Sequence, residues 1–343
     1  MFIQNYTQLP NKFYSICQPE PLQNARLISI NQRLVNQLQL STDSNEILGW
    51  LTGETLNPNM VPIAQKYTGH QFGYYNPNLG DGRGLLLGQW QDTQGRYWDF
   101  HLKGAGRTPY SRRGDGRAVL RSTIREFLAS EALYGLGVPT TRALALAISS
   151  DQVRREIMEP RATLIRVTST HIRFGHFEWA VSQGEQAFQA LLNFVLENHY
   201  SDFLSSDNQA FELLQEICRR TAKLIAKWQA VGFNHGVMNT DNFSILGETF
   251  DFGPFAFMDD FTIGYICNHS DTEARYAYNQ QPKVGLWNCQ ILAGTFQHIL
   301  TEAQLDEALD KYIETYNQSY IDEMRAKLGL SGLQNKPNQD KED

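Results

Sequence analysis

The chain has 343 residues, of which 41% are hydrophobic, and it carries a formal net charge of -7. This length permits two domains or one two-lobed domain, and the negative charge argues against general nucleic-acid binding. No apolar run approaches the roughly 18 residues of a membrane helix, and residues 1–13 lack the apolar centre of a secretory signal. We therefore expect a cytoplasmic monomer without nucleic-acid or membrane partners.

A glycine-rich turn at residues 80–84 opens the first informative segment. It leads into an apolar run, a turn at residues 92–95 and a strand-like stretch that ends at Lys103. Glycines let backbone N–H groups approach phosphates closely, and a lysine on the neighbouring strand supplies a fixed positive charge. Each part alone is commonly an ordinary turn or a solvated lysine. Together they indicate a phosphate-binding hairpin.

Positive charge and glycine are concentrated in residues 103–125. Seven cations lie there beside one acid, Asp115, whereas even spreading would give about two. Guanidinium groups bind phosphate oxygens in bidentate fashion, so the segment suits a polyphosphate ligand. A solvated basic face is the alternative. The cations are Lys103, Arg107, Arg112, Arg113, Arg117, Arg121 and Arg125.

The spacing of apolar residues from Leu120 to Leu133 predicts a helix that ends before Gly135. Glu126 lies on this helix, where it could pair with Lys103 and hold the lysine towards phosphate. Thr123 and Glu126 also fit a capping box, in which the glutamate only caps the helix start. Because the helical pattern begins before Thr123, the pairing is the preferred interpretation.

Later segments predict an α+β, protein-kinase-like fold with two lobes. Strands are expected at residues 143–149 and 162–168, which completes a sheet-rich N-lobe. Residues 211–228 have helical spacing before Gly232, and residues 305–328 form one or two amphipathic helices. We expect residues 1–175 to hold an N-terminal extension and the N-lobe, 176–330 an incomplete helical C-lobe, and 331–343 a polar tail.

The segment from His235 to Asn242 is followed by Asp251-Phe252-Gly253. Carboxylate and amide oxygens suit Mg²⁺ or Mn²⁺, which bridge phosphate oxygens during phosphoryl or nucleotidyl transfer. Asp-Phe-Gly alone is an ordinary strand-to-turn sequence. Combined with the upstream lysine and glycines, it predicts an enzyme that uses ATP.

In their order, these motifs closely resemble the selenoprotein O family of protein adenylyltransferases, pseudokinases that move AMP. The likeness spans roughly residues 60 to 295, and its main stretches are residues 67–73, 79–83, 102–112, 121–128, 161–167, 171–175, 235–251 and 264–271. In ordinary kinases four residues separate the catalytic Asp from the metal-binding Asn, whereas Asp241 and Asn242 are adjacent. This departure favours the pseudokinase family.

The resemblance implies transfer of AMP from ATP to Ser, Thr or Tyr hydroxyls of proteins. It implies that ATP binds flipped, with its terminal phosphate buried among arginines. Asp241 would be the catalytic base, and Asn242 with Asp251 would bind Mg²⁺ or Mn²⁺. The nucleotide would contact Gly80, Gly82, Arg83, Lys103, Asp115, Gly116, Glu126, Arg166, Arg173 and Asp251.

Three alternatives remain at this point. One is a catalytically inactive, ATP-binding scaffold, another is UMP transfer from UTP, and the third is an RNA-binding module built on the arginines. The chain also ends earlier than the family pattern, which implies a truncated or short form. Its four cysteines lack paired spacing and predict neither a zinc site nor a disulfide framework.

Overall fold

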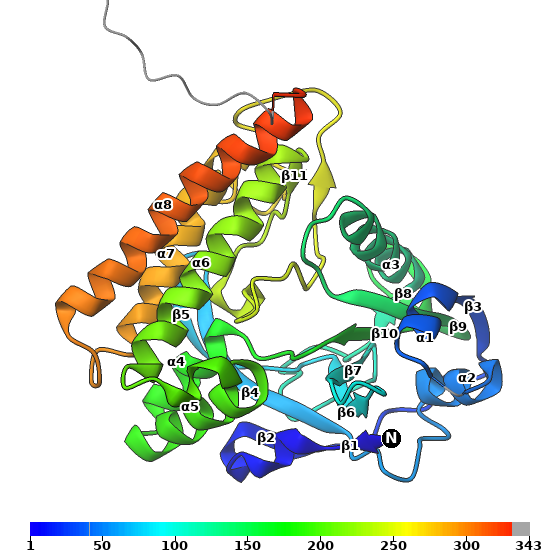
Figure 1. Ribbon diagram of the computed structural model, residues 1–343. Helices are drawn as coiled ribbons and strands as arrows, with labels where there is room; N and C mark the ends of the chain where they lie inside the picture. The colour runs from blue at the N-terminus through cyan, green and yellow to red at the C-terminus, as the bar shows by residue number, and fades with distance from the viewer. Residues whose placement is uncertain (41, 331–343) are drawn as a thin grey trace, which may run out of the picture.

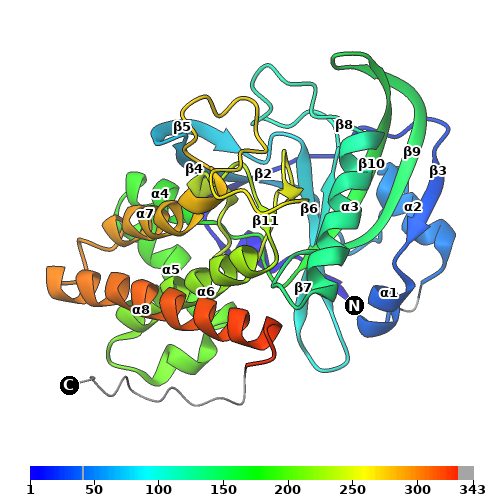
Figure 2. The ribbon, with the colours of Figure 1, turned by 90° about the horizontal axis from the view of Figure 1, so that it is seen from above.

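The computed structural model describes residues 1–40 and 42–330, so the predicted polar tail lies outside the described part of the chain. Strands dominate up to residue 168 and helices dominate after it, which gives the predicted α+β arrangement. Figure 2 shows the helices of residues 174–327 on one side, together with the hairpin of residues 63–80, and the helices of residues 32–135 beside the strands of residues 142–168 on the other.

Ten strands of the described residues form one antiparallel sheet in the order β2-β4-β6-β7-β10-β9-β3, with β5 beside β4, β1 beside β6 and β8 beside β10. The predicted hairpin and both predicted later strands are present, and β9 and β10 are longer than expected. The strands are β1 (Phe2–Ile3), β2 (Tyr14–Ile16), β3 (Arg26–Ile30), β4 (Ile63–Gln71), β5 (Tyr74–Gly80), β6 (Gly84–Gln91), β7 (Tyr97–Lys103), β8 (Ala118–Val119), β9 (Arg142–Arg154) and β10 (Met158–Thr168).

The central strand β6 is buried on both faces, which explains its continuous apolar run. Leu86 belongs to a large core that continues into the helical lobe, whereas Leu85 and Leu87 belong to a second core beneath α1 (Gln32–Gln37) and α2 (Ser44–Thr52). The N-terminal residues are part of this arrangement. Phe2 packs edge-on against Trp50, and β1, β2 and β3 are strands of the sheet.

Helix α3 (Leu120–Gly135) follows β8 directly and packs on β9 and β10. Its partly buried Leu120, Ile124 and Phe127 contact a small cluster of buried sheet residues. Glu126 is 1% exposed and lies on the buried side of the helix with Thr123, Ser130 and Leu133.

The helical lobe is built around α6 (Gln209–Ala230), whose apolar side is almost fully buried. Figure 1 shows α6 and α8 side by side, and α8 is one continuous helix. Gly232 has a left-handed φ of 68° just after α6, as expected of a residue that ends a helix. The other elements are α4 (Phe174–Ser182), α5 (Glu185–His199), β11 (Phe233–Asn234), β12 (Ala256–Phe257), α7 (Gln281–Gly294) and α8 (Glu302–Lys327).

None of the helices within residues 1–40 and 42–330 has both the length and the apolar composition needed to traverse a lipid bilayer.

Glu248 links the end of the sheet to the segment that precedes Asp251. Its carboxylate accepts a hydrogen bond from the Thr168 hydroxyl, and burial raises the pKa of Glu248 to about 7. A carboxyl whose folded-state pKa is raised destabilises the fold increasingly as pH rises from its unfolded value towards the folded value. We expect Glu248→Gln to raise Tm by a few degrees at pH 8, from roughly 1–3 kcal/mol of relieved ionisation cost, and to change it little at pH 4.

Thermal unfolding at both pH values measures this effect, with the exposed Glu197→Gln as the matched control. An unchanged Tm at pH 8, or an equal rise at both pH values, would contradict the role given to Glu248.

Candidate active site

A cavity of about 700 Å³ lies between the sheet and the helical lobe. Its walls come from β5, β7, β10, the loop between β7 and β8, and the segment from Val237 to Gly253. Segments far apart in the sequence therefore meet at one place. The predicted site residues on its walls are Gly80, Gly82, Arg83, Lys103, Asp115, Gly116, Arg166, Arg173, Asp241, Asn242 and Asp251.

Glu126 does not line the cavity but anchors two cations that do. Lys103 Nζ donates to Glu126 Oε2, and Arg166 donates to Glu126 Oε1 from Nε at 2.9 Å and from Nη2 at 2.7 Å. The preferred pairing is therefore present. The capping-box alternative is wrong, because the helix begins at Leu120 and Thr123 donates to Val119 O.

The charges of these groups depend on one another. Burial, with the nearby cations Arg83 and Arg166, lowers the pKa of Lys103 to about 8, although Glu126 opposes the shift. Burial favours the neutral form of Glu126, but Arg166 and Lys103 outweigh it and hold its pKa below the usual value. Lys103, Glu126 and Arg166 therefore form an ionic cluster in the wall of the cavity. Little water screens their charges there, so the charges act strongly on a ligand.

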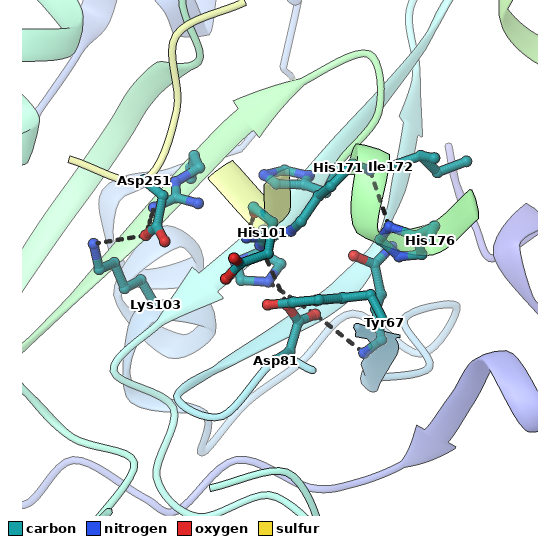
Figure 3. Close-up of polar contacts among 12 residues, drawn as sticks. Tyr67, Asp81, His101, Lys103, His171, Ile172, His176 and Asp251 are labelled. Carbon is teal, nitrogen blue, oxygen red and sulfur yellow. Dashed lines mark hydrogen bonds and ion pairs between the residues drawn. The ribbon is translucent and has the colours of Figure 1, made fainter. Parts of the chain in front are cut away.

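Asp251 faces these cations from the helical lobe. Its Oδ1 lies 3.8 Å from Lys103 Nζ and 3.4 Å from Arg166 Nη2, as Figure 3 shows for the lysine. Burial opposes ionisation, but Lys103 and Arg166 hold the pKa of Asp251 far below its usual range. Its φ of 65° is left-handed, a conformation rare outside glycine that clusters at functional sites.

Asp81 is a site residue that the sequence interpretation omitted. In Figure 3 it lies close to Tyr67 and His101. Its carboxylate accepts hydrogen bonds from the Tyr67 hydroxyl at 3.3 Å and from Arg173 Nη2 at 3.4 Å, and His101 Nε2 lies 3.3 Å away. Arg173 also donates to Asp241 O at 2.9 Å. Asp81 therefore orients an arginine that joins the glycine-rich turn to Asp241.

Asp241 is 8% exposed and lines the cavity. Burial raises the pKa of Asp241 to about 7, although Arg173 lowers it. Its Oδ2 accepts a hydrogen bond from Gln71 Nε2 at 3.3 Å, whereas its buried Oδ1 has no partner within the described residues. Oδ1 is enclosed against Gly69, so Oδ2 is the oxygen that can accept a proton from a group in the cavity.

Asn242 also presents an unpaired oxygen. Its amide nitrogen donates to Val237 O at 3.0 Å, and its buried Oδ1 has no partner among residues 1–40 and 42–330. No cluster of three or more His, Cys, Asp or Glu suited to a metal occurs in that part of the chain. One amide and one carboxylate oxygen suit a Mg²⁺-type ion that also takes phosphate oxygens and water. The residues present therefore fit the expected metal.

The cations of residues 103–125 fall into two groups according to what they contact. Arg107, Arg112, Arg113 and Arg117 line the cavity together with Lys103. The other two cations of the segment turn away: Arg121 pairs with Glu159 at 3.0 Å, and Arg125 donates to Phe255 O at 2.7 Å. Arg107, Arg112 and Arg113 are solvent-exposed as well as lining the cavity, so a solvated basic face stays an alternative for them.

Arg155, in the turn between β9 and β10, is a second omission. It donates to both Asp115 oxygens, at 2.8 and 3.0 Å, and to Arg117 O at 2.9 Å, so it closes the arginine loop over the cavity. The local sequence of Arg155 gives no signal of this. The local sequence of Asp81 does give such a signal, since Asp81 lies between Gly80 and Gly82, which were predicted to contact the nucleotide.

Comparisons with known proteins agree with one another. The family model described as "Protein adenylyltransferase SelO" matches residues 1–342. The chain is similar to "Protein nucleotidyltransferase YdiU" of Hydrogenovibrio crunogenus, with 64% identity over 336 residues, covering 96% of this chain and 70% of the relative. It is also similar to the protein of that name from Aliivibrio salmonicida, with 52% identity, covering 95% and 68%.

Among solved structures, Toxoplasma gondii ROP2, described as having a protein-kinase fold and no enzymatic activity, aligns with a TM-score of 0.33 and 10% identity. The alignment covers 88% of this chain and 98% of that chain. A likeness at this level carries no argument about the site.

Proposed function

The chain belongs to the protein adenylyltransferase SelO family, and we propose that its cavity holds ATP with the triphosphate against the arginines and the α-phosphate beside Asp241. The protein is a nucleotidyltransferase that moves AMP from ATP to proteins. The family description names a transferase of AMP, which favours neither an inactive scaffold nor UMP as the transferred group. RNA binding has no support beyond the arginines themselves.

The orientation of ATP rests on where the positive charge lies. Arg166 and Arg173 are almost fully buried, and the arginines of the β7–β8 loop line the same cavity. The terminal phosphates carry most of the charge of ATP, so they bind where paired donors are most numerous. In this orientation Lys103 holds the phosphates, steadied by Glu126, and the flexible loop closed by Arg155 and Asp115 surrounds the terminal end.

Asp241 acts as the general base in this proposal. Its Oδ2 takes the proton of a protein Ser, Thr or Tyr hydroxyl as the hydroxyl oxygen bonds to the α-phosphorus and pyrophosphate leaves. A pKa near 7 suits a base that works near neutral pH, because it combines ionisation with useful basicity. Gly80, Gly82 and Gly116 line the cavity, and a Cβ at Gly80 or Gly116 would clash with Tyr110 or Gly106, so these glycines let the β7–β8 loop pack closely beside the nucleotide.

Asn242 and Asp251 would hold the divalent cation, Mg²⁺ or Mn²⁺. When bound, such an ion neutralises charge that develops on phosphate oxygens during transfer. The unpaired Asn242 Oδ1 and the ionised Asp251 carboxylate support this assignment.

One observation carries the proposal. The buried ionic cluster of Lys103, Glu126 and Arg166 lies at a single cavity, and further arginines line this cavity together with Asp241, Asn242 and Asp251. An RNA-binding face would expose all its cations to solvent, whereas Arg166 and Arg173 are buried and converge with the exposed loop arginines on a cavity of about 700 Å³.

Transfer from ATP labelled at either the α or the γ phosphate tests the orientation. With Mg²⁺ or Mn²⁺ present, we expect protein-bound label only from α-labelled ATP, because the γ-phosphate is held away from the acceptor. Asp241→Asn is the control that distinguishes covalently transferred label from tightly bound ATP, and we expect this variant to carry little label. Label arriving only from the γ position would overturn the proposal in favour of a kinase, and label from neither would favour a scaffold.

A further inference from the structure

The hairpin formed by β4 and β5 lies directly against the segment that holds Asp241. At Gly69 of β4, an added Cβ would lie 3.1 Å from both Cβ and Oδ1 of Asp241 and 3.1 Å from the Thr240 hydroxyl. Such contacts are tighter than ordinary van der Waals spacing, so a side chain at residue 69 would displace its neighbours. The absence of a side chain there lets a strand of the sheet touch the proposed base.

A closed set of hydrogen bonds fixes this contact. The backbone N–H of His70 donates to Thr240 Oγ1 at 2.7 Å, and the Thr240 hydroxyl donates to Glu178 Oε1. The second oxygen of Glu178 lies 2.7 Å from His70 Nδ1. Glu178 is 4% exposed and Thr240 is fully buried. The buried carboxylate of Glu178 on α4 therefore joins β4 to the segment that holds Thr240 and Asp241.

Hydrogen bonds also fix the tip of the β4–β5 hairpin. The backbone N–H of Phe72 donates to Asn239 Oδ1 at 3.2 Å and to the Tyr276 hydroxyl at 2.9 Å. Residues 69 to 72 thus contact residues 239 to 241 continuously. A side chain on this part of the hairpin has a fixed position relative to Asp241, because its backbone is held on both sides.

Gln71 is the side chain that uses this fixed position. Its Oε1 accepts a hydrogen bond from Asn76 Nδ2 of β5 at 3.1 Å, and its Nε2 donates to Asp241 Oδ2 at 3.3 Å. Since the oxygen of the amide is occupied by a donor, its nitrogen faces the carboxylate. Asp241 Oδ1 is buried against Gly69, whereas the side chains of Gln71 and Asp241 both line the cavity.

We propose that Gln71 is a positioning residue for AMP transfer: with Oδ1 enclosed against Gly69, it holds Asp241 Oδ2 in the cavity, towards the acceptor hydroxyl. This inference rests on the proposed role of Asp241 as the base. A carboxylate that rotates about its Cβ–Cγ bond presents either oxygen in many directions, and proton transfer requires one oxygen within hydrogen-bond reach of the hydroxyl. Gln71 removes that freedom through its hydrogen bond to Oδ2.

Steady-state kinetics of Gln71→Leu tests the proposal. The substitution removes the amide donor and nearly preserves the size of the side chain. We expect kcat to fall roughly tenfold or more, as for loss of a hydrogen bond to a charged group, with the KM for ATP and the Tm unchanged. Gln94→Leu makes the same chemical change at the exposed tip of the β6–β7 turn, outside the cavity, and should leave kcat at the parent value.

A double-mutant cycle with Asp241→Asn completes the test. If Gln71 acts through Asp241, adding Gln71→Leu to Asp241→Asn causes little further loss. An unchanged kcat in Gln71→Leu, or an equal fractional loss in both backgrounds, overturns the positioning role and leaves the assignment of Asp241 intact. Full activity of Asp241→Asn alone overturns the base and this inference together, which is a distinct result.

Discussion

Asp251→Asn is expected to lower AMP transfer by roughly a thousandfold or more at saturating ATP. The substitution keeps the shape of the side chain but removes the carboxylate proposed to bind the metal. It also removes the negative charge opposite Lys103 and Arg166. Asparagine tolerates the left-handed φ of 65° better than most residues, so the loss is expected without unfolding.

The measurement is kcat as a function of Mg²⁺ or Mn²⁺ concentration, together with Tm. Asp260→Asn, at an exposed position in the same segment, is the matched control and should behave like the parent. If Asp251→Asn transferred AMP as fast as the parent at the same metal concentration, Asp251 would not be a ligand of the working metal.

Glu126→Gln is expected to have the second largest effect, on stability and on nucleotide binding together. Its carboxylate is 1% exposed and pairs with Lys103 and Arg166, whose side chains are 6% and 3% exposed. Removing one partner of a buried ion cluster costs roughly 3–5 kcal/mol, because it leaves a buried charge without compensation. We expect Tm to fall by about 5 °C or more and the KM for ATP to rise.

Thermal unfolding and ATP titration measure the two effects. Glu307→Gln makes the same change on an exposed part of α8 and should alter neither. Adding Lys103→Met to Glu126→Gln should restore part of the lost stability, since the unpaired cation is gone, without restoring ATP binding. If Glu126→Gln alone kept the parent's Tm, the ion cluster would not stabilise the wall of the cavity.

The parts of this fold that could be predicted from sequence are those with local signals. The helical spacing of residues 211–228 and the glycine after it predicted α6 closely, and the turn at residues 92–95 predicted the β6–β7 hairpin. The first 30 residues were expected only as an extension, yet they supply three strands of the sheet. Their partners lie far along the chain, and strands as short as β1 have no periodicity to detect.

The same distinction applies to the site. Lys103 and Glu126 belong to a recognisable pattern of charge and glycine, so their pairing could be anticipated. Gln71 and Arg155 gave no comparable signal, because a glutamine on a strand and an arginine in a turn are ordinary surface residues. Their importance depends on Asp241 and Asp115, which lie 170 and 40 residues away and are brought close only by the fold.

The position of the first strands in the sheet has a consequence for biosynthesis. Phe2 pairs with Trp90, and Arg26 pairs with Ile148, so neither strand can dock when it leaves the ribosome. At a typical rate of 5–20 residues per second, the chain needs roughly 10–30 s to reach the end of β10. Phe2, which finally packs on Trp50, Trp90 and Phe100, lacks the last of these partners for roughly 5–20 s of synthesis. The nucleotide cavity is therefore assembled late, after both of its walls have been synthesised.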